Sequence, residues 1–257
     1  MTPKHPIYVP SLGRAETCST PRILDREGVS FTLVVEPHEF DEYARAFGAE
    51  RVEPLPEGGK GLPYSRNWIK RTARERGHDW CWQLDDDVVH FTEFVGKSRR
   101  RCTAVEAVAF CESLAASFSN VRVIGTTSEA FAFTTADRQF VPNRIAYTTV
   151  LVDTRFEGAW RDGVIDDTDY SLQVLSSGAC TLLVTRYAHL SAASDSHPGG
   201  LTELRAGDGR LRLVRGLERR WPGVVTTTRR FGKVKSNVTG LSKWPQRPEA
   251  VHDQARA

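Results

Sequence analysis

The sequence lacks the features that mark membrane, secreted and repetitive proteins. No apolar run approaches the roughly 20 residues that a membrane-spanning helix needs. No charged and then apolar leader precedes the first apolar segment, so we expect no signal peptide. Internal repeats and low-complexity tracts are also absent. We therefore expect a cytoplasmic protein that does not bind a membrane.

Cysteine and net charge are both scarce. The five cysteines are an odd number, and no pair has the spacing of a zinc site or of a C-x-x-C motif. We expect reduced thiols that fill the core, as in cytoplasmic proteins. The net charge of +3 is too small to indicate a nucleic-acid partner by itself, so only local clusters can carry that argument.

The remaining composition suits a single folded domain. The chain has 257 residues, of which 40% are hydrophobic and 26% are charged. Up to residue 84, apolar strands alternate with helices and short loops. The expected strands are 7–9, 31–35, 51–55 and 80–84, and the expected helices are 20–27, 38–47 and 66–76. This alternation predicts an α/β fold with a mainly parallel sheet covered by helices.

The pattern changes beyond this region. We expect a basic loop at 97–101, a helix at 103–118, and strands at 121–124, 130–133, 145–153 and 180–185. Two more helices are expected to begin at Asp166 and to cover 201–220, the second interrupted near Gly207. One domain would then span residues 1–248, and residues 249–257 would form a flexible tail.

Three adjacent carboxylates, Asp85, Asp86 and Asp87, directly follow the expected strand 80–84. Ligands bind at the carboxyl ends of strands in open α/β sheets. In extended backbone, Asp85 and Asp87 point to one side and Asp86 to the other. Two carboxylates on one side suit Mg2+ or Mn2+, which can neutralise a departing diphosphate. A solvated acidic turn is the alternative, and the preceding strand favours the metal.

A second acidic cluster, Asp166-Asp167-Thr168-Asp169, opens an expected helix. Acidic residues in the first helical turn are favoured by the helix dipole alone. One of these carboxylates could instead be a general base that activates an acceptor hydroxyl. Both interpretations stay open on the residues themselves.

Two arginines and a histidine are weaker candidates. Arg14 follows Gly13, which lets the backbone approach a ligand closely. Arg66 follows Ser65 at an expected helix start, where an anionic ligand would explain an arginine. His197 lies in a loop, and a lone histidine is more often structural than a ligand. All three would otherwise be ordinary surface side chains.

Four segments together resemble a known family. The ordered set 7–14, 34–37, 65–69 and 82–87 resembles the TET/JBP-associated glycosyltransferases, over roughly residues 5 to 200. These are phage and bacterial GT-A enzymes that place sugars on hydroxymethylated pyrimidines in DNA. If a phage encodes the chain, the expected location becomes the host cytoplasm.

The resemblance implies a GT-A fold, a UDP-sugar donor and Mn2+ or Mg2+. It divides the domain into a nucleotide-sugar-binding half at 1–95 and an acceptor-binding half at 96–248. By resemblance, the donor-binding residues are Pro10, Ser11, Arg14, Glu36, Arg66, Asn67, Asp85 and Asp86. The metal ligands are Asp87, Asp85 and His197, and the catalytic base is Asp167. Glu36 would read the base edge, and Asp86 has no firm role.

A DNA acceptor requires groups that neutralise phosphates. The candidate clusters are 97–101 and the basic residues Arg229, Arg230, Lys233 and Lys235. Lys233 or Lys235 could instead face the donor diphosphate. Tyr147, Trp160 and Trp244 could stack on a base that leaves the duplex. Solvated charged loops are the alternative interpretation of both clusters.

Two other functions stay open. A sugar-nucleotide-forming nucleotidyltransferase would share the fold and the metal, and Leu12-Gly13-Arg14 is faintly similar to its glycine-rich loop. The additional glycines and the following lysine of that loop are missing. A non-catalytic module that binds a nucleotide-sugar or DNA is the second alternative. The sugar, the nucleotide base, the stereochemical outcome and the oligomeric state do not follow from the sequence.

Overall fold

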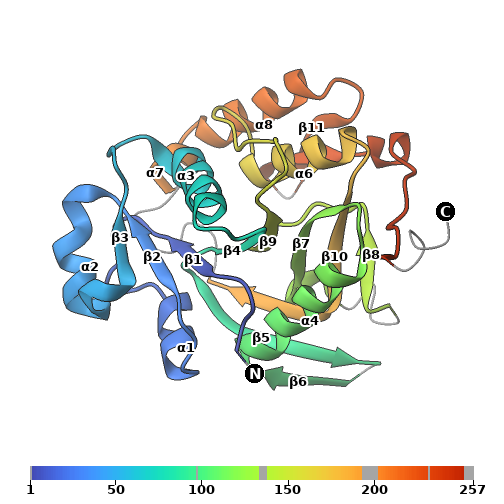
Figure 1. Ribbon diagram of the computed structural model, residues 1–257. Helices are drawn as coiled ribbons and strands as arrows, with labels where there is room; N and C mark the ends of the chain where they lie inside the picture. Colours follow the sequence, from blue (N-terminus) through green and yellow to red (C-terminus); the bar gives the residue numbers. More distant parts are fainter. Residues whose placement is uncertain (1, 97, 133–137, 193–201, 231, 252–257) are drawn as a thin grey trace.

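The computed structural model describes residues 2–96, 98–132, 138–192, 202–230 and 232–251 (Figure 1). Within them, ten strands form one sheet in the order β3-β2-β1-β4-β9-β7-β10-β5-β6, with β8 beside β10. Strands β11 and β12 form a separate hairpin. No helix of these ranges has the length and apolar character to cross a bilayer.

The first half of the sheet is parallel, as its short strand-helix alternation predicted. It contains β1 (Ile7–Pro10), β2 (Thr32–Val35), β3 (Val52–Pro54) and β4 (Trp80–Leu84). The connecting helices are α1 (Thr20–Arg26), η1 (Pro37–Glu39), α2 (Phe40–Phe47), η2 (Ala49–Arg51) and α3 (Gly61–Glu75). Helix α3 begins five residues before the expected start, because Pro63 is tolerated in a first helical turn.

The second half of the sheet is mixed. It contains β5 (Val88–Val95), β6 (Ser98–Cys102), β7 (Val121–Ser128), β8 (Phe140–Pro142), β9 (Thr149–Asp153) and β10 (Cys180–Ser191). Strand β9 is antiparallel to both β4 and β7, whereas β7 and β10 are parallel. Helix α4 (Ala104–Ser117) begins at a capping box of Thr103 and Glu106. Helix α6 (Asp166–Ser176) follows β9.

Two local expectations are wrong. The basic segment expected as a loop forms strand β6, which pairs with β5 at the edge of the sheet. The segment expected as a strand near residue 130 forms the short helix α5 (Glu129–Ala132). A short apolar run does not distinguish strand from helix by its periodicity.

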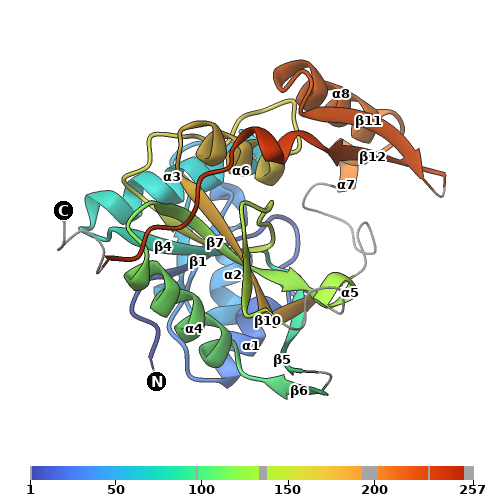
Figure 2. The same cartoon turned by 90° about the vertical axis from the view of Figure 1, so that its right-hand side faces the viewer.

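Helices cover both faces of the sheet. Side chains of α1 and α4 pack with one face in the largest core cluster, and α3 and α6 pack on the other face (Figure 1). The C-terminal elements α7 (Thr202–Arg205), α8 (Gly209–Arg220), β11 (Val225–Arg230), β12 (Lys233–Val238) and η3 (Gly240–Lys243) follow. They form a projection at one end, and Leu217 and Val225 pack there with Leu172 of α6 (Figure 2).

The chain then returns to the sheet. The backbone N–H of Ser119 donates to the carbonyl of Glu249, and Phe118 forms a bridge with Ala250. Hydrogen bonds thus hold the start of the segment that we expected to be a flexible tail. Residues 252–257 lie outside the described ranges, and the division of the domain into two halves stays a prediction.

The topology fixes where a ligand can bind. Strand order reverses between β1 and β4, because β2 and β3 follow on one side of β1 and β4 lies on the other. Such a reversal opens a crevice at the carboxyl ends of the strands. Ser11, Glu36 and Asp85 each directly follow the strand β1, β2 or β4 and therefore lie at this crevice.

Candidate active site

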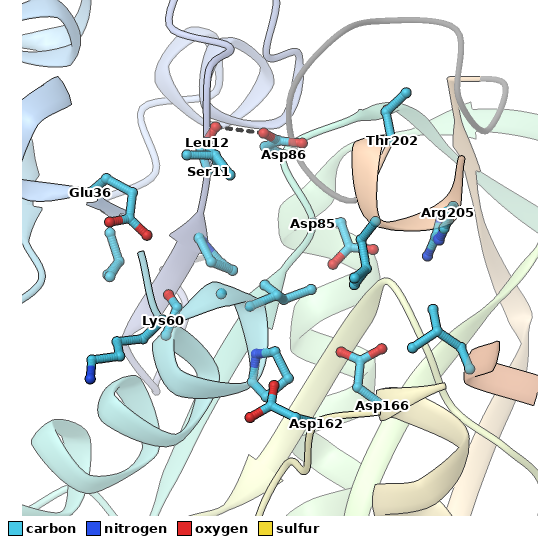
Figure 3. A pocket seen from close by; sticks show the side chains of 18 of the residues that line it. Ser11, Leu12, Glu36, Lys60, Asp85, Asp86, Asp162, Asp166, Thr202 and Arg205 are labelled. Atoms are coloured by element: carbon cyan, nitrogen blue, oxygen red, sulfur yellow. Dashed lines mark hydrogen bonds between the residues drawn. The ribbon is translucent and has the colours of Figure 1, made fainter. Parts of the chain in front are cut away.

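A cavity of about 450 Å³ occupies this crevice (Figure 3). Its walls are the ends of β1, β2 and β4, the start of α3, the loop before α6, and the helices α7 and α8. The predicted site residues that line it are Pro10, Ser11, Arg14, Glu36, Asp85, Asp86 and Asp87. Arg66, Asn67 and Asp167 are not among the lining residues, and His197 lies outside the described ranges.

The acidic run is a turn, not a continuation of β4. Asp86 and Asp87 form the turn between β4 and β5, so extended-strand alternation does not separate the three carboxylates. Backbone contacts hold the turn from several sides. Ser19 and Thr20 donate their N–H groups to the Asp86 carbonyl at 2.9 and 3.1 Å, and Ala192 donates to the Asp87 carbonyl at 2.9 Å. The run is thereby fixed at the cavity wall.

Asp86 ties down the first loop. Its carboxylate accepts hydrogen bonds from Ser11 Oγ at 2.5 Å and from the Arg14 guanidinium at 2.8 Å (Figure 3). The Tyr43 hydroxyl lies 2.7 Å from Ser11 Oγ and accepts the Arg14 N–H at 3.0 Å. Asp86 therefore shapes the cavity wall together with Ser11 and Arg14, which gives it the role that the sequence left open.

Arg66 lies in the interior, within helix α3, rather than at a helix start. Its side chain is 1% exposed, and Nη2 contacts Asp85 Oδ1 at 2.7 Å. Asp166 and Asp167 of α6 lie 3.5 Å from the same guanidinium. Burial opposes its charge, but Asp167, Asp85 and Asp166 outweigh burial and raise the pKa of Arg66. Arg66 thus joins the end of β4 to the start of α6 from beneath the cavity, instead of contacting the donor directly.

Asn67 has a structural task. Its amide donates to the Trp160 carbonyl at 2.7 Å and accepts the Trp160 N–H at 2.9 Å. Both ends of the amide are therefore occupied by the loop that precedes α6. This pairing accounts for Asn67 without a donor, and we withdraw it from the donor-binding set.

Asp87 has the least satisfied carboxylate of the run. Its Oδ1 is buried and accepts no hydrogen bond within the described residues. Burial, followed by Asp85 and Asp86, raises the pKa of Asp87 to about 7. An orphaned carboxylate oxygen beside two further carboxylates fits a hard cation. No group of three or more potential ligand side chains surrounds one point in the described ranges, so water and substrate phosphates would complete such a site.

The second acidic cluster faces the first across the cavity. Asp166 lines the wall, and its Oδ2 is buried without a hydrogen bond within the described residues. Burial raises the pKa of Asp167 to about 8; Asp166 and Asp85 add to this effect, and Arg66 opposes it. The dipole-only interpretation of this cluster does not explain why it converges on Arg66 with Asp85.

Glu36 anchors a loop over the opposite end of the cavity. Its Oε2 accepts the Gly59 N–H at 2.7 Å, and the side chain is 6% exposed. A Cβ at Gly58 would lie 2.9 Å from the same oxygen, so the loop passes unusually close to Glu36. Val34, Leu55 and Leu62 give this end an apolar lining. The arrangement suits a flat ring with one polar edge, and base recognition by Glu36 stays a prediction.

Arg205 was missed by the sequence reasoning. It lines the cavity on the wall opposite Glu36 (Figure 3), and its buried Nε makes no hydrogen bond within the described residues. It also acts to lower the pKa of Asp167. No motif surrounds Arg205, so only the fold brings it to the site. By contrast, Lys235 is exposed on β12 and does not line the cavity.

Of the three proposed stacking aromatics, only Tyr147 lies beside the acidic site. Burial, followed by Asp167, raises the pKa of Tyr147. Trp160 is 3% exposed and stacks on Tyr170 with ring centroids 3.9 Å apart, so it is a core residue. Trp244 packs edge-on against Trp221 in the C-terminal projection.

Thr148 is a second residue that the sequence did not indicate. Its φ of 66° is in the left-handed region, which a β-branched residue rarely adopts. Its carbonyl accepts the Asp85 N–H at 2.7 Å, and its side-chain hydrogen bond acts to lower the pKa of Asp85, which burial raises. The strained backbone therefore positions the first carboxylate of the run.

Replacing Thr148 with glycine is expected to raise the free energy of unfolding by about 1 kcal/mol. The left-handed conformation costs a non-glycine residue about 1–2 kcal/mol, and the extra entropy of glycine offsets part of this gain. Thr148→Ala keeps the Cβ strain and serves as the matched control, which should show no gain. Urea denaturation of both variants measures the difference. A glycine variant no more stable than the alanine variant would contradict the strain.

The fold and this cavity define an α/β protein with an acidic ligand site at the carboxyl edge of its sheet. The chain belongs to the TET-associated glycosyltransferase family, whose sequence profile matches residues 5–199. This match confirms the resemblance seen in the sequence, and with the mixed sheet it confirms the expected α/β fold class. The protein is therefore a glycosyltransferase.

Two solved structures are similar to the chain. A197 from STIV has 10% identity and a TM-score of 0.42, covering 76% of this chain and 87% of that chain. A putative nucleotide-diphospho-sugar transferase from Desulfovibrio desulfuricans G20 has 11% identity and a TM-score of 0.42, covering 72% and 80%. No curated protein gives a significant sequence match.

Proposed function

We propose that the protein transfers a sugar from a UDP-sugar to the hydroxyl of a 5-hydroxymethylpyrimidine in DNA, with Mn2+ or Mg2+ bound at the site. One observation carries the transferase site: the orphaned Asp87 carboxylate and the Asp166-Asp167 pair face a single cavity. The nucleotide, the modified base and the phage context rest on the family resemblance, because a fold alone does not define a substrate.

The residues around Asp87 fit a divalent cation. Asp87 and Asp85 would hold it, and five carboxylates face only the guanidinium groups of Arg14 and Arg66 near them. When bound, the cation neutralises charge on the departing diphosphate. Arg205, on the facing wall, is the cationic side chain that we assign to the same diphosphate. His197, the third expected ligand, stays a prediction.

The donor would lie along the cavity. Its base would occupy the apolar end, where the Glu36 carboxylate can accept a hydrogen bond from a ring N–H. Its diphosphate would then reach Asp85 and Asp87 at the other end. Ser11, Arg14 and Pro10 form the wall between these ends, and Asp86 keeps that wall in place.

Asp167 is the proposed catalytic base. It would accept the proton of the acceptor hydroxyl as that oxygen attacks the anomeric carbon, which suits inversion. A raised pKa matches this task, because a base works best when its pKa lies near the working pH. Asp166 lines the cavity directly and is the alternative base. Tyr147, beside Asp167, would contact the acceptor ring.

The test is incubation of hydroxymethylated DNA with a panel of UDP-sugars and Mn2+, followed by mass spectrometry of the nucleosides. We expect the mass of one hexose on the modified base and at least about 100-fold less product with Asp167→Asn, as for loss of a general base. The rate should rise with pH up to about 8, because only ionised Asp167 accepts a proton.

The controls separate the proposed function from its rivals. Glu157→Gln removes a carboxylate that is exposed on the far side of the Arg74 ion pair and should leave the rate unchanged. No mass shift with any sugar on any hydroxymethylated base would rule out the DNA acceptor. Pyrophosphate released from nucleoside triphosphates would favour the nucleotidyltransferase, and donor binding without turnover would favour a binding module.

A further inference from the structure

A second pocket, of about 220 Å³, lies away from the donor cavity and shares no lining residue with it. It is formed by β5, the edge strand β6 and the short helix α5. The lining residues are His90, Thr92, Arg99, Arg100, Arg101 and Glu129. In Figure 2 these elements lie at the same end of the molecule as α7 and the β11–β12 hairpin.

Strand pairing separates the three arginines of β6. Arg100 lies opposite Glu93 and forms ion pairs with Glu93 at 2.5 Å and with Glu106 at 2.6 Å. Arg99 and Arg101 point to the other face, because side chains alternate along a strand. On that face Arg101 lies opposite Thr92, and both arginines are exposed. Only Arg100 is thus neutralised in the structure of the hairpin.

The acidic side chain of this pocket is already engaged. Glu129 Oε1 hydrogen bonds with His90 Nε2 at 2.8 Å and accepts the Thr92 hydroxyl. One carboxylate therefore faces two guanidinium groups, which leaves the pocket with a net positive charge. Guanidinium groups bind phosphate oxygens through paired N–H donors, so the charge and the donors suit a phosphodiester.

The position of the pocket relative to the donor cavity limits what it can bind. Strand β5 begins at Val88, next to Asp87. At about 3.3 Å per residue, His90 lies about 10 Å and Thr92 about 17 Å from Asp87 along the strand. One strand of duplex DNA carries a phosphate about every 3.4 Å of helix axis. A phosphate about 3–5 nucleotides from a base at Asp87 would therefore reach the pocket.

We propose that the pocket between β5, β6 and α5 binds a backbone phosphate of a nucleic-acid acceptor, a few nucleotides from the base that receives the sugar. This inference rests on the proposed function for the identity of the acceptor. Protection of an edge strand by charge explains arginines on β6 in general. It does not explain why two of them share a pocket with a hydrogen-bonded Glu129, His90 and Thr92.

The test compares Arg99→Gln/Arg101→Gln with the control Arg45→Gln/Arg71→Gln, which removes the same charge from exposed sites on α2 and α3. Binding of a 20-base-pair hydroxymethylated duplex is measured by fluorescence anisotropy between about 50 and 200 mM salt. We expect the slope of log K against log salt to shrink by about 1–2, since each lost phosphate contact removes about 0.9. The control should keep the wild-type slope.

Acceptor length gives a second measurement. A hydroxymethylated trinucleotide is too short to reach the pocket, so Arg99→Gln/Arg101→Gln should transfer sugar to it at the wild-type kcat/KM. On the long duplex the same variant should lose several-fold in kcat/KM through a higher KM. Circular dichroism and thermal melting of both double variants confirm that the fold is kept.

The outcomes distinguish the pocket from the proposed function. Equal slopes in the two double variants, or an equal loss on both acceptors, would overturn the pocket. A change only in inhibition by inorganic phosphate would assign the pocket to a free anion and overturn the nucleic-acid partner. If the wild type transfers no sugar but shows the arginine-dependent slope, the pocket is supported and the proposed function is rejected.

Discussion

Replacing Arg66 with methionine is expected to lower the free energy of unfolding by about 3–5 kcal/mol, because breaking a buried ion pair leaves uncompensated charge. Arg66 is 1% exposed, and Asp85, Asp166 and Asp167 all lie within 3.5 Å of its guanidinium. Methionine keeps much of the side-chain volume, so the loss reports the charge rather than a cavity. Urea denaturation provides the measurement.

The loss should depend on pH in a defined direction. Burial already raises the pKa of Asp167 from 3.8 to about 8, so the folded state binds a proton more tightly than the unfolded state. Stability linked to this group is present below pH 3.8 and falls as pH rises toward 8. Without Arg66 the pKa rises further. The variant should therefore be closer to wild type at pH 5 than at pH 8.

A matched control lies on the same helix. Arg71 is exposed on α3 and pairs only loosely with Glu75 at 3.9 Å. Arg71→Met should change the free energy of unfolding by less than about 0.5 kcal/mol, as surface substitutions usually do. A loss with Arg66→Met that is below 1 kcal/mol, or that grows as pH falls, would show that the three carboxylates do not depend on this guanidinium.

The sequence indicated the parallel half of the fold because local signals and tertiary structure agree there. Each strand is apolar and ends at a turn, and short connections force neighbouring strands to pair in parallel. Strand β6 was missed because three consecutive arginines favour a solvated loop. Its pairing with β5 depends on partners for Arg100 that only the folded chain provides. Strand formation at an edge is set by such contacts more than by propensity.

The candidate site was predictable to the same extent. Residues that directly follow strands, such as Ser11, Glu36 and Asp87, line the cavity because the carboxyl ends of parallel strands meet at one edge. Arg66 could be named from the sequence but not placed, since its direction depends on where α3 begins. Arg205 and Thr148 had no signal, because one depends on the packing of the C-terminal helices and the other on a backbone angle.

Replacing Asp87 with asparagine is expected to reduce sugar transfer at least about 1,000-fold, since a catalytic cation contributes several kcal/mol to the transition state and each 1.36 kcal/mol is tenfold. The substitution keeps the shape of the side chain and removes one carboxylate from the proposed cation site. Initial rates over a series of Mn2+ concentrations measure the loss. Calorimetry should show weaker Mn2+ binding in the same variant.

Stability should move in the opposite direction from activity. In the absence of a cation, Asp87 is repelled by Asp85 and Asp86, and burial adds to the cost of its charge. Asparagine removes that repulsion, so the metal-free variant should be at least as stable as the wild type at pH 8. Mn2+ should raise the melting temperature of the wild type, because a ligand that binds only the folded state stabilises it, and should have little effect on the variant.

Asp41→Asn is the matched control, because Asp41 is an exposed aspartate on α2, remote from the cavity lining. It should retain the wild-type rate and the wild-type response of the melting temperature to Mn2+. If Asp87→Asn kept more than a tenth of the activity with an unchanged Mn2+ dependence, the cation would have to bind elsewhere. A simultaneous loss of activity and of metal-free stability would instead make Asp87 a structural residue. Only the combination of lost transfer, lost Mn2+ response and preserved folding identifies Asp87 as the cation ligand.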